Sequence, residues 1–130
     1  DMMNDEVKKI GANYSHFTNP VGIDDNNNYS TAYDLYLILK YSLKNNTFKA
    51  LFEANDHYLS TYGKTVYKTT YNTARQYGLD IGVIKGTKTG FTYDAGMCLA
   101  STSSANNVDY LIITLNWAGL TKLNWTPLIG

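Results

Sequence analysis

Cysteine, histidine and excess charge are all scarce in this sequence of 130 residues. The single cysteine, Cys98, excludes an intramolecular disulfide framework and a cysteine-based zinc site. The two histidines, His16 and His57, lie far apart and would need carboxylates to complete a metal site, so we expect neither a metal nor a cofactor. The 11 Lys and Arg residues balance 11 Asp and Glu residues, which argues against nucleic acid as a partner.

Long apolar runs are also absent. The longest apolar stretch, Tyr110 to Leu115, falls far short of the roughly 20 residues that a membrane-spanning helix needs. The first residues carry no signal pattern of basic residues followed by apolar ones. Hydrophobic residues nevertheless make up 44% of the chain, and aromatic residues 14%, which is enough for a folded core. A chain of this length forms one domain or part of one.

Helical spacing of apolar residues marks three segments of the first half. Met3 to Ile10 predicts an amphipathic helix, which Gly11 ends. Apolar residues at i, i+3 and i+4 predict a second helix over about Ala32 to Leu43, with Ser30 or Thr31 as its N-cap. A shorter helix is expected over Phe48 to Ala54.

The segments between and after these helices have different patterns. Asn13 to Tyr29 is rich in turn-forming residues and predicts a long ordered loop. Tyr58 to Tyr71, with a turn at Gly63, predicts a β-hairpin or irregular extended arms. Val83 to Thr89, Gly96 to Thr102 and Tyr110 to Trp117 predict three antiparallel strands, joined by hairpin connections that contain residues 92–95 and 103–107.

Helices followed by a sheet indicate an α+β fold. We expect one partial domain over residues 1–130, in which residues 1–80 form a helix and loop portion. Residues 81–118 form the three antiparallel strands, and residues 119–130 form a tail.

Lys88-Thr89-Gly90 is the motif with the clearest chemistry, and we expect it to end the first of the three strands. A glycine allows a ligand to approach the backbone closely, while a lysine and a hydroxyl face the same cleft. Taken alone, the tripeptide is more often a solvated strand end followed by a turn. Its context therefore decides its meaning.

Three segments in order resemble serine-type D-alanyl-D-alanine carboxypeptidases, the low-molecular-mass penicillin-binding proteins of the peptidase S11 type. Ser15 to Asp24 is similar to the family's T-H-F-x-N-P-x-G-L-D loop, and Asn28 to Leu35 to the helix entry after it. Ile84 to Ser101 is similar to the segment that contains the family's K-T-G motif. The resemblance covers about Met3 to Trp117 and implies part of the penicillin-binding protein and β-lactamase-like transpeptidase fold.

The resemblance also implies roles for the residues around the motif. Lys88 would hold the terminal carboxylate of the substrate or set the electrostatics of the cleft, and Thr89 would donate a hydrogen bond to the same carboxylate. The backbone N–H of Phe91 would be one of two oxyanion donors. Gly90 and Thr92 complete the expected substrate-binding set, with Lys88 and Phe91 as the catalytic residues.

Three elements of the family's pattern are missing or out of place. No serine in this chain is followed three residues later by a lysine, so the S-x-x-K motif of the nucleophile is missing. Ser104-Ala105-Asn106 spells S-x-N, but it follows K-T-G and is interpreted as a coincidence in a hairpin turn. No arginine follows Arg75, although family members often place one after the last strand. We therefore expect the C-terminal half of a catalytic domain, inactive without its N-terminal half.

The function implied by resemblance is that of an extracytoplasmic carboxypeptidase. Such an enzyme removes the terminal D-Ala from peptidoglycan stem peptides through an acyl-enzyme and binds β-lactam antibiotics. One alternative is a non-catalytic module that binds peptidoglycan or a partner chain. Another is a fragment of a class A β-lactamase, although neither Glu6 nor Glu53 is placed as a deacylation base.

Other conspicuous residues have simpler interpretations. We expect Lys85 to be a solvated charge, His16 to have a hydrogen-bonded packing role, and Cys98 to be a small buried hydrophobe rather than a nucleophile. The tyrosines could stack on sugar rings, but such residues more often pack across neighbouring strands. The tyrosines in question are Tyr58, Tyr62, Tyr67, Tyr71 and Tyr77.

Overall fold

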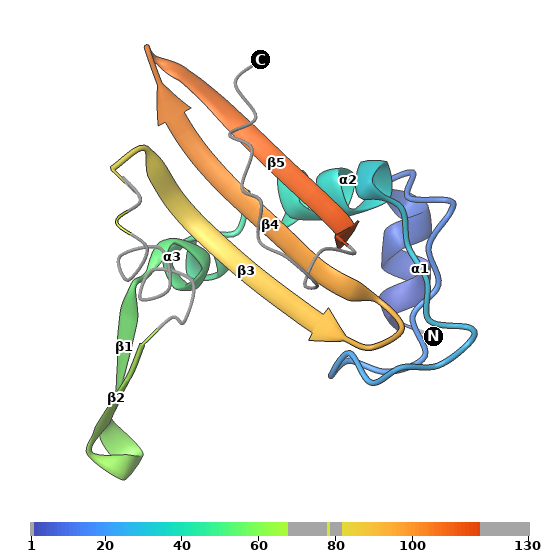
Figure 1. Ribbon diagram of the computed structural model, residues 1–130, viewed down its shortest axis with the longest axis horizontal. Helices are drawn as coiled ribbons and strands as arrows, with labels where there is room; N and C mark the ends of the chain where they lie inside the picture. Colours follow the sequence, from blue (N-terminus) through green and yellow to red (C-terminus); the bar gives the residue numbers. More distant parts are fainter. Residues whose placement is uncertain (1, 68–77, 79–81, 118–130) are drawn as a thin grey trace.

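In the computed structural model, which describes residues 2–67, 78 and 82–117, helices precede the main sheet (Figure 1). The helices are α1 (Met2–Lys9), α2 (Ala32–Ser42) and α3 (Asn46–Glu53). The first two match their predicted positions to within one residue at each end. None of the helices in these residues combines the length and apolar character needed to cross a membrane.

Side-chain caps explain where α2 and α3 begin. Thr31 is the N-cap of α2, because its hydroxyl accepts a hydrogen bond of 3.1 Å from the backbone N–H of Asp34. The predicted start of α3 at Phe48 is wrong by two residues. The side chain of Asn45 accepts a hydrogen bond of 3.0 Å from the N–H of Phe48, which starts the helix at Asn46.

The long loop after α1 is held by two buried polar side chains. The carboxylate of Asp34, only 1% exposed, accepts hydrogen bonds from the N–H of Tyr14 at 2.7 Å and from the hydroxyl of Ser15 at 2.8 Å. The side chain of Asn4 donates to the backbone carbonyl of Phe17 and accepts from its N–H, both at 2.8 Å. These bonds satisfy backbone groups that have no helix or sheet partner and confirm an ordered loop.

The hairpin that precedes the main sheet in sequence projects away from the rest of the described chain (Figure 1). Strand β1 (Asp56–Leu59) pairs antiparallel with β2 (Lys64–Tyr67), and the short helix η1 (Ser60–Tyr62) joins them through Gly63, whose φ is +59°. Every residue of both strands is exposed. The predicted hairpin is therefore confirmed, although residues 68–71 of the predicted segment lie outside the described residues.

The main sheet has the order β3-β4-β5 and is antiparallel throughout. Its strands are β3 (Ile84–Thr92), β4 (Gly96–Ala105) and β5 (Val108–Trp117). In the register of the sheet, Lys88 is opposite Ala100, which in turn is opposite Ile113. Among the described strands, β4 is therefore central and β3 lies at an edge.

The predicted ends of the strands need correction. The first strand excludes Val83 and continues past Lys88-Thr89-Gly90 to Thr92, so the motif lies within the strand. The second strand continues to Ala105, and the third strand already begins at Val108. Only Asn106 and Asn107 lie between them, with φ values of +51° and +62°. Asparagine tolerates this left-handed conformation and closes a two-residue turn, where a longer connection was expected.

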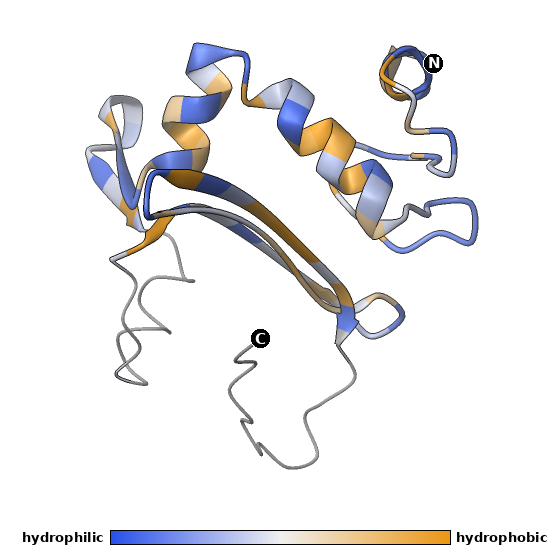
Figure 2. Cartoon of the chain, turned by 90° about the horizontal axis from the view of Figure 1, so that it is seen from above, coloured by the Kyte–Doolittle hydropathy of each residue, from blue (hydrophilic) through white to orange (hydrophobic). Residues whose placement is uncertain are grey.

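The helices lie on one side of the main sheet, with α2 against β5 and α3 against β3 (Figure 2). The α3–β3 contact is close, because the ring of Phe52 lies where a side chain at residue 86 would project. Among the described hydrophobic residues, those that are buried form a short set: Val7, Ala12, Leu39 and Phe52. Many larger apolar side chains are exposed.

This small core predicts that the isolated chain associates with itself or unfolds at low temperature. Exposed apolar side chains and an unpaired edge strand favour association. Light scattering after size-exclusion chromatography is expected to show oligomers or aggregates, which an added N-terminal half converts to a defined complex. A monomer of the isolated chain with one cooperative thermal transition would contradict this prediction.

Candidate active site

Strand β3 changes from buried to exposed at the K-T-G motif. Gly86 and Thr87 are buried, whereas Lys88, Thr89, Gly90 and Phe91 are exposed. In an antiparallel pair, alternate backbone N–H groups of an edge strand point away from the neighbouring strand. The exposed half of β3 therefore offers a ligand both side chains and backbone donors along one edge.

Lys88 and Thr89 bring a cation and a hydroxyl to adjacent positions of this edge. Successive residues of a strand project to opposite faces. The ammonium group of Lys88 nevertheless folds back and donates a hydrogen bond to the backbone carbonyl of Thr89. The charge of Lys88 therefore lies beside the backbone of Thr89, at the exposed part of the strand.

The two glycines of β3 serve different purposes. A Cβ atom at Gly86 would lie 2.5 Å from Cδ1 of the Phe52 ring and 2.9 Å from the backbone oxygen of Phe52, so packing against α3 requires glycine there. A Cβ atom at Gly90 would meet only the Cβ atom of Cys98, at 3.9 Å, which is an ordinary contact. The fold does not require glycine at residue 90. A ligand that approaches the backbone closely would require a glycine there.

The end of β3 is fixed by Thr92, whose hydroxyl accepts a hydrogen bond of 3.0 Å from the backbone N–H of Ala95 in the following turn. Because the hydroxyl is the acceptor in this bond, it can still donate its own hydrogen to a ligand. Just beyond it lies Tyr93, a residue outside the motif that the sequence did not single out. Its side chain is 96% exposed.

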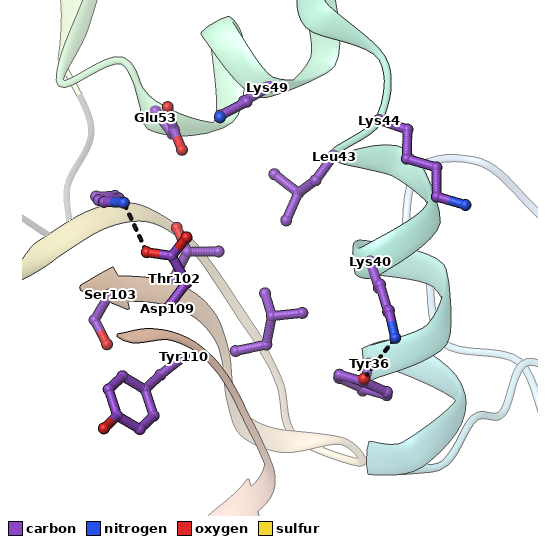
Figure 3. A pocket seen from close by; sticks show the side chains of 12 residues that line it. Tyr36, Lys40, Leu43, Lys44, Lys49, Glu53, Thr102, Ser103, Asp109 and Tyr110 are labelled. Atoms are coloured by element: carbon purple, nitrogen blue, oxygen red, sulfur yellow. Dashed lines mark hydrogen bonds and ion pairs between the residues drawn. The ribbon is translucent and has the colours of Figure 1, made fainter. Parts of the chain in front are cut away.

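A cavity of about 490 Å³ lies elsewhere, between α2, α3 and the sheet. Figure 3 shows Lys49 and Glu53 of α3 on one side of it and Asp109 and Tyr110 of β5 on the other. None of the K-T-G residues lines it. This partly open cavity is therefore separate from the exposed motif.

Lys85, at the rim of this cavity, is not the simple solvated charge that the sequence suggested. Its ammonium group forms an ion pair of 2.8 Å with the carboxylate of Asp109 on β5. Hydrogen bonds from Lys85 and then Ser104 lower the pKa of Asp109 below its usual value. Within residues 2–67, 78 and 82–117, the partially exposed Lys85 thus has an anionic partner, whereas Lys88 has none.

The remaining singled-out residues have structural positions. His16 bonds the backbone oxygen of Asn27 through Nδ1 at 2.6 Å and pairs with Tyr29, as expected for a packing role. Cys98 on the central strand is half-buried rather than buried, and its partner in the register is Gly90, which has no side chain to cover it. Ser104 is next to the start of β3, where its N–H donates to the oxygen of Val83, so the S-x-N tripeptide lies away from Lys88.

The fold of three helices and an antiparallel sheet is that of part of a penicillin-binding-protein-like DD-peptidase. The chain is similar in structure to the D-alanyl-D-alanine carboxypeptidase of Mycobacterium tuberculosis, with a TM-score of 0.75 and 22% identity over 92% of this chain and 44% of that one. It is also similar to penicillin-binding protein D2 of Listeria monocytogenes in its cefotaxime-bound form, with a TM-score of 0.71 and 24% identity over 88% of this chain and 46% of that one.

The sequence comparison identifies the family. The model of peptidase S11, described as D-alanyl-D-alanine carboxypeptidase, matches residues 1–119, and the chain belongs to this family. The D-alanyl-D-alanine carboxypeptidase DacF of Bacillus subtilis is 30% identical over 112 residues, which are 82% of this chain and 27% of the relative. The chain thus spans about a quarter of the length of this curated relative and less than half of the two solved structures.

Proposed function

We propose that this chain forms one wall of the active site of a serine-type D-alanyl-D-alanine carboxypeptidase. The substrate would be a peptidoglycan stem peptide that ends in D-Ala-D-Ala, and β-lactam antibiotics would bind at the same place. The observation that carries the proposal is the exposed Lys88-Thr89-Gly90 segment on the edge strand of a family member. Peptidoglycan lies outside the cytoplasm, so we propose a secreted or envelope-associated protein.

The residues of β3 have defined roles in this proposal. Lys88 and Thr89 bind the terminal carboxylate of the peptide and so place its last peptide bond beside Phe91. When a serine oxygen adds to the carbonyl carbon of that bond, negative charge develops on the carbonyl oxygen, and the backbone N–H of Phe91 stabilises it. Gly90 keeps the space beside the backbone free. Thr92 lies next to the oxyanion donor and contacts the bound peptide.

The nucleophile belongs to an N-terminal half that would complete the cleft. No S-x-x-K motif occurs in these 130 residues, and the matched relatives are two to four times longer than the matched part. The serine would lose its proton to the paired lysine, form an ester with the penultimate D-Ala, and release the terminal D-Ala with a proton on its amine. Water would then cleave the ester and restore the serine.

The test is intact-mass spectrometry of the chain after incubation with a penicillin, first alone and then mixed with the N-terminal half. We expect no adduct on the chain alone and one penicillin on the N-terminal half in the mixture. An adduct on the 130-residue chain itself would show that the nucleophile is misassigned. No adduct in a mixture that forms a stable complex would contradict the proposed function.

A non-catalytic peptidoglycan-binding module is the second candidate, because the β1–β2 hairpin exposes Tyr58, Tyr62 and Tyr67. Aromatic rings of this kind can stack on sugars. Co-sedimentation with intact peptidoglycan, without penicillin acylation of the mixture, would favour this function. Loss of co-sedimentation on replacing the three tyrosines by serine would assign the binding to the hairpin.

A class A β-lactamase fragment is less well supported. The carboxylate of Glu6 accepts hydrogen bonds from Tyr41 at 2.7 Å and from Lys9 at 2.9 Å, and Glu53 lines the cavity away from the motif. Neither glutamate therefore lies beside Lys88 as a deacylation base would. Rapid hydrolysis of penicillin by the assembled protein, in place of a lasting adduct, would reverse this conclusion.

A further inference from the structure

Phe52 joins helix α3 to the strand that carries the K-T-G motif. Its side chain is 8% exposed and belongs to the buried apolar set of the described residues. The ring lies over Gly86, where a Cβ atom would be 2.5 Å from Cδ1 and 2.8 Å from Cε1 of the ring. Gly86 precedes Lys88 by two residues on β3, so the contact lies just before the strand changes from buried to exposed.

This part of β3 needs support from outside the sheet. Among the described strands, β4 is the one neighbour of β3, which leaves the other edge of β3 unpaired. The ladder between β3 and β4 also shifts its register between Ile84 and Gly86. An irregularity of this kind bends a strand and increases its twist. The direction in which β3 continues toward the motif therefore depends on what packs at Gly86, which is α3 (Figure 2).

The position of Phe52 is fixed by its own helix. Phe48, one turn earlier on α3, stacks on Phe52 with ring centroids 5.8 Å apart and ring planes at 13°. The side chain of Asn45 caps the helix at the N–H of Phe48. The backbone oxygen of Phe52 also lies 2.9 Å from the place of a Cβ atom at Gly86. Because such close packing resists compression, the position of α3 is passed on to β3.

We propose that Phe52 is a positioning residue for acylation: by packing on Gly86 it sets the direction of β3 and so places Lys88 in the cleft. This inference rests on the proposed carboxypeptidase function. At its other end the strand is fixed by the hydrogen bond from the N–H of Ala95 to the hydroxyl of Thr92. The exposed motif lies between these two fixed points. Phe52 acts through the strand and takes no part in bond cleavage.

The experiment is a double-mutant cycle on penicillin acylation of the assembled domain. Phe52→Leu keeps an apolar side chain but removes the ring from Gly86. We expect it to lower the acylation rate constant about tenfold, because a small displacement of a ligand-binding group is costly at a reacting centre. Lys88→Ala already lacks the group that Phe52 places, so adding Phe52→Leu to it should cost less than about threefold. Phe52→Met, whose flexible side chain can still reach Gly86, should keep more of the rate than Phe52→Leu.

Leu39→Ala is the matched control, because Leu39 is also buried but lies on α2, which packs against β5. It should lower Tm at least as much as Phe52→Leu, yet change acylation by less than about twofold while the domain is folded. Equal losses of rate in these two variants would reduce the role of Phe52 to general stability and overturn the inference. An unchanged rate in Phe52→Leu, or a full tenfold loss on top of Lys88→Ala, would also overturn it. In all these cases acylation of the wild type leaves the proposed function standing, whereas a wild type that is not acylated removes both.

Discussion

Replacing Lys88 by alanine is expected to lower the rate constant for penicillin acylation of the assembled domain roughly 100- to 1000-fold. Lys88 is the charged member of the exposed motif, and its ammonium group donates to the backbone carbonyl of Thr89. In the proposed roles, its loss removes the charge-assisted hydrogen bond to the ligand's carboxylate and leaves only the hydroxyl of Thr89 to bind that anion. Stopped-flow or gel measurements with a fluorescent penicillin give the rate constant.

Lys85→Ala is the control, since it removes the same charge from the same strand three residues earlier. Lys85 pairs with Asp109, whose pKa its hydrogen bond lowers. We therefore expect acylation to change by less than about threefold, because a solvent-exposed ion pair contributes little. Equal losses in the two variants would mean that the general charge of the strand, and not the position of Lys88, matters.

Gly86→Ala is expected to lower the free energy of unfolding of the assembled domain by about 3 kcal/mol, the upper end for overpacking. The new Cβ atom would lie 2.5 Å from the ring of Phe52 and 2.9 Å from the backbone oxygen of that residue. The ring can rotate or shift, whereas the backbone of α3 can move only with its helix. Urea unfolding measures the change, and shortening Phe52 should relieve it only in part.

Gly90→Ala separates folding from ligand binding in the same strand. Its Cβ atom would lie 3.9 Å from the nearest atom, so we expect the free energy of unfolding to change by less than about 1 kcal/mol. Acylation should nevertheless fall about tenfold or more, because the methyl group occupies the space through which the ligand approaches. Normal acylation in Gly90→Ala would show that the ligand does not come close to this part of the backbone.

Local patterns predicted which elements form, but they placed some of the ends of these elements wrongly. Helix α2 begins where Thr31 caps it and Asp34 favours the first turn. Helix α3 begins earlier than its apolar spacing indicated, because the apolar pattern starts at Phe48 while the cap is Asn45. In the same way, β4 and β5 reach their turn at Asn106 and Asn107, although serine and asparagine there suggested a longer loop.

The contacts that could not be predicted depend on register across the sheet. A register shift between Ile84 and Gly86 places Lys85 where it pairs with Asp109, two strands away. The contact between Gly86 and Phe52 depends on how α3 packs, which no spacing within β3 reveals. The K-T-G motif could be recognised in the sequence because its three residues are consecutive. The roles of Lys88, Thr89 and Phe91 toward a substrate stay predictions.

The three strands of the main sheet are neighbours both in space and in the chain, joined by two short turns. Contacts between residues close in sequence require little loop-closure entropy, and proteins rich in such contacts fold quickly. The edge that carries Lys88 is therefore expected to form early, as part of a double hairpin. The slower step would be the docking of more distant segments against it, so the assembly of the cleft, more than the formation of this strand, would set the time at which activity appears.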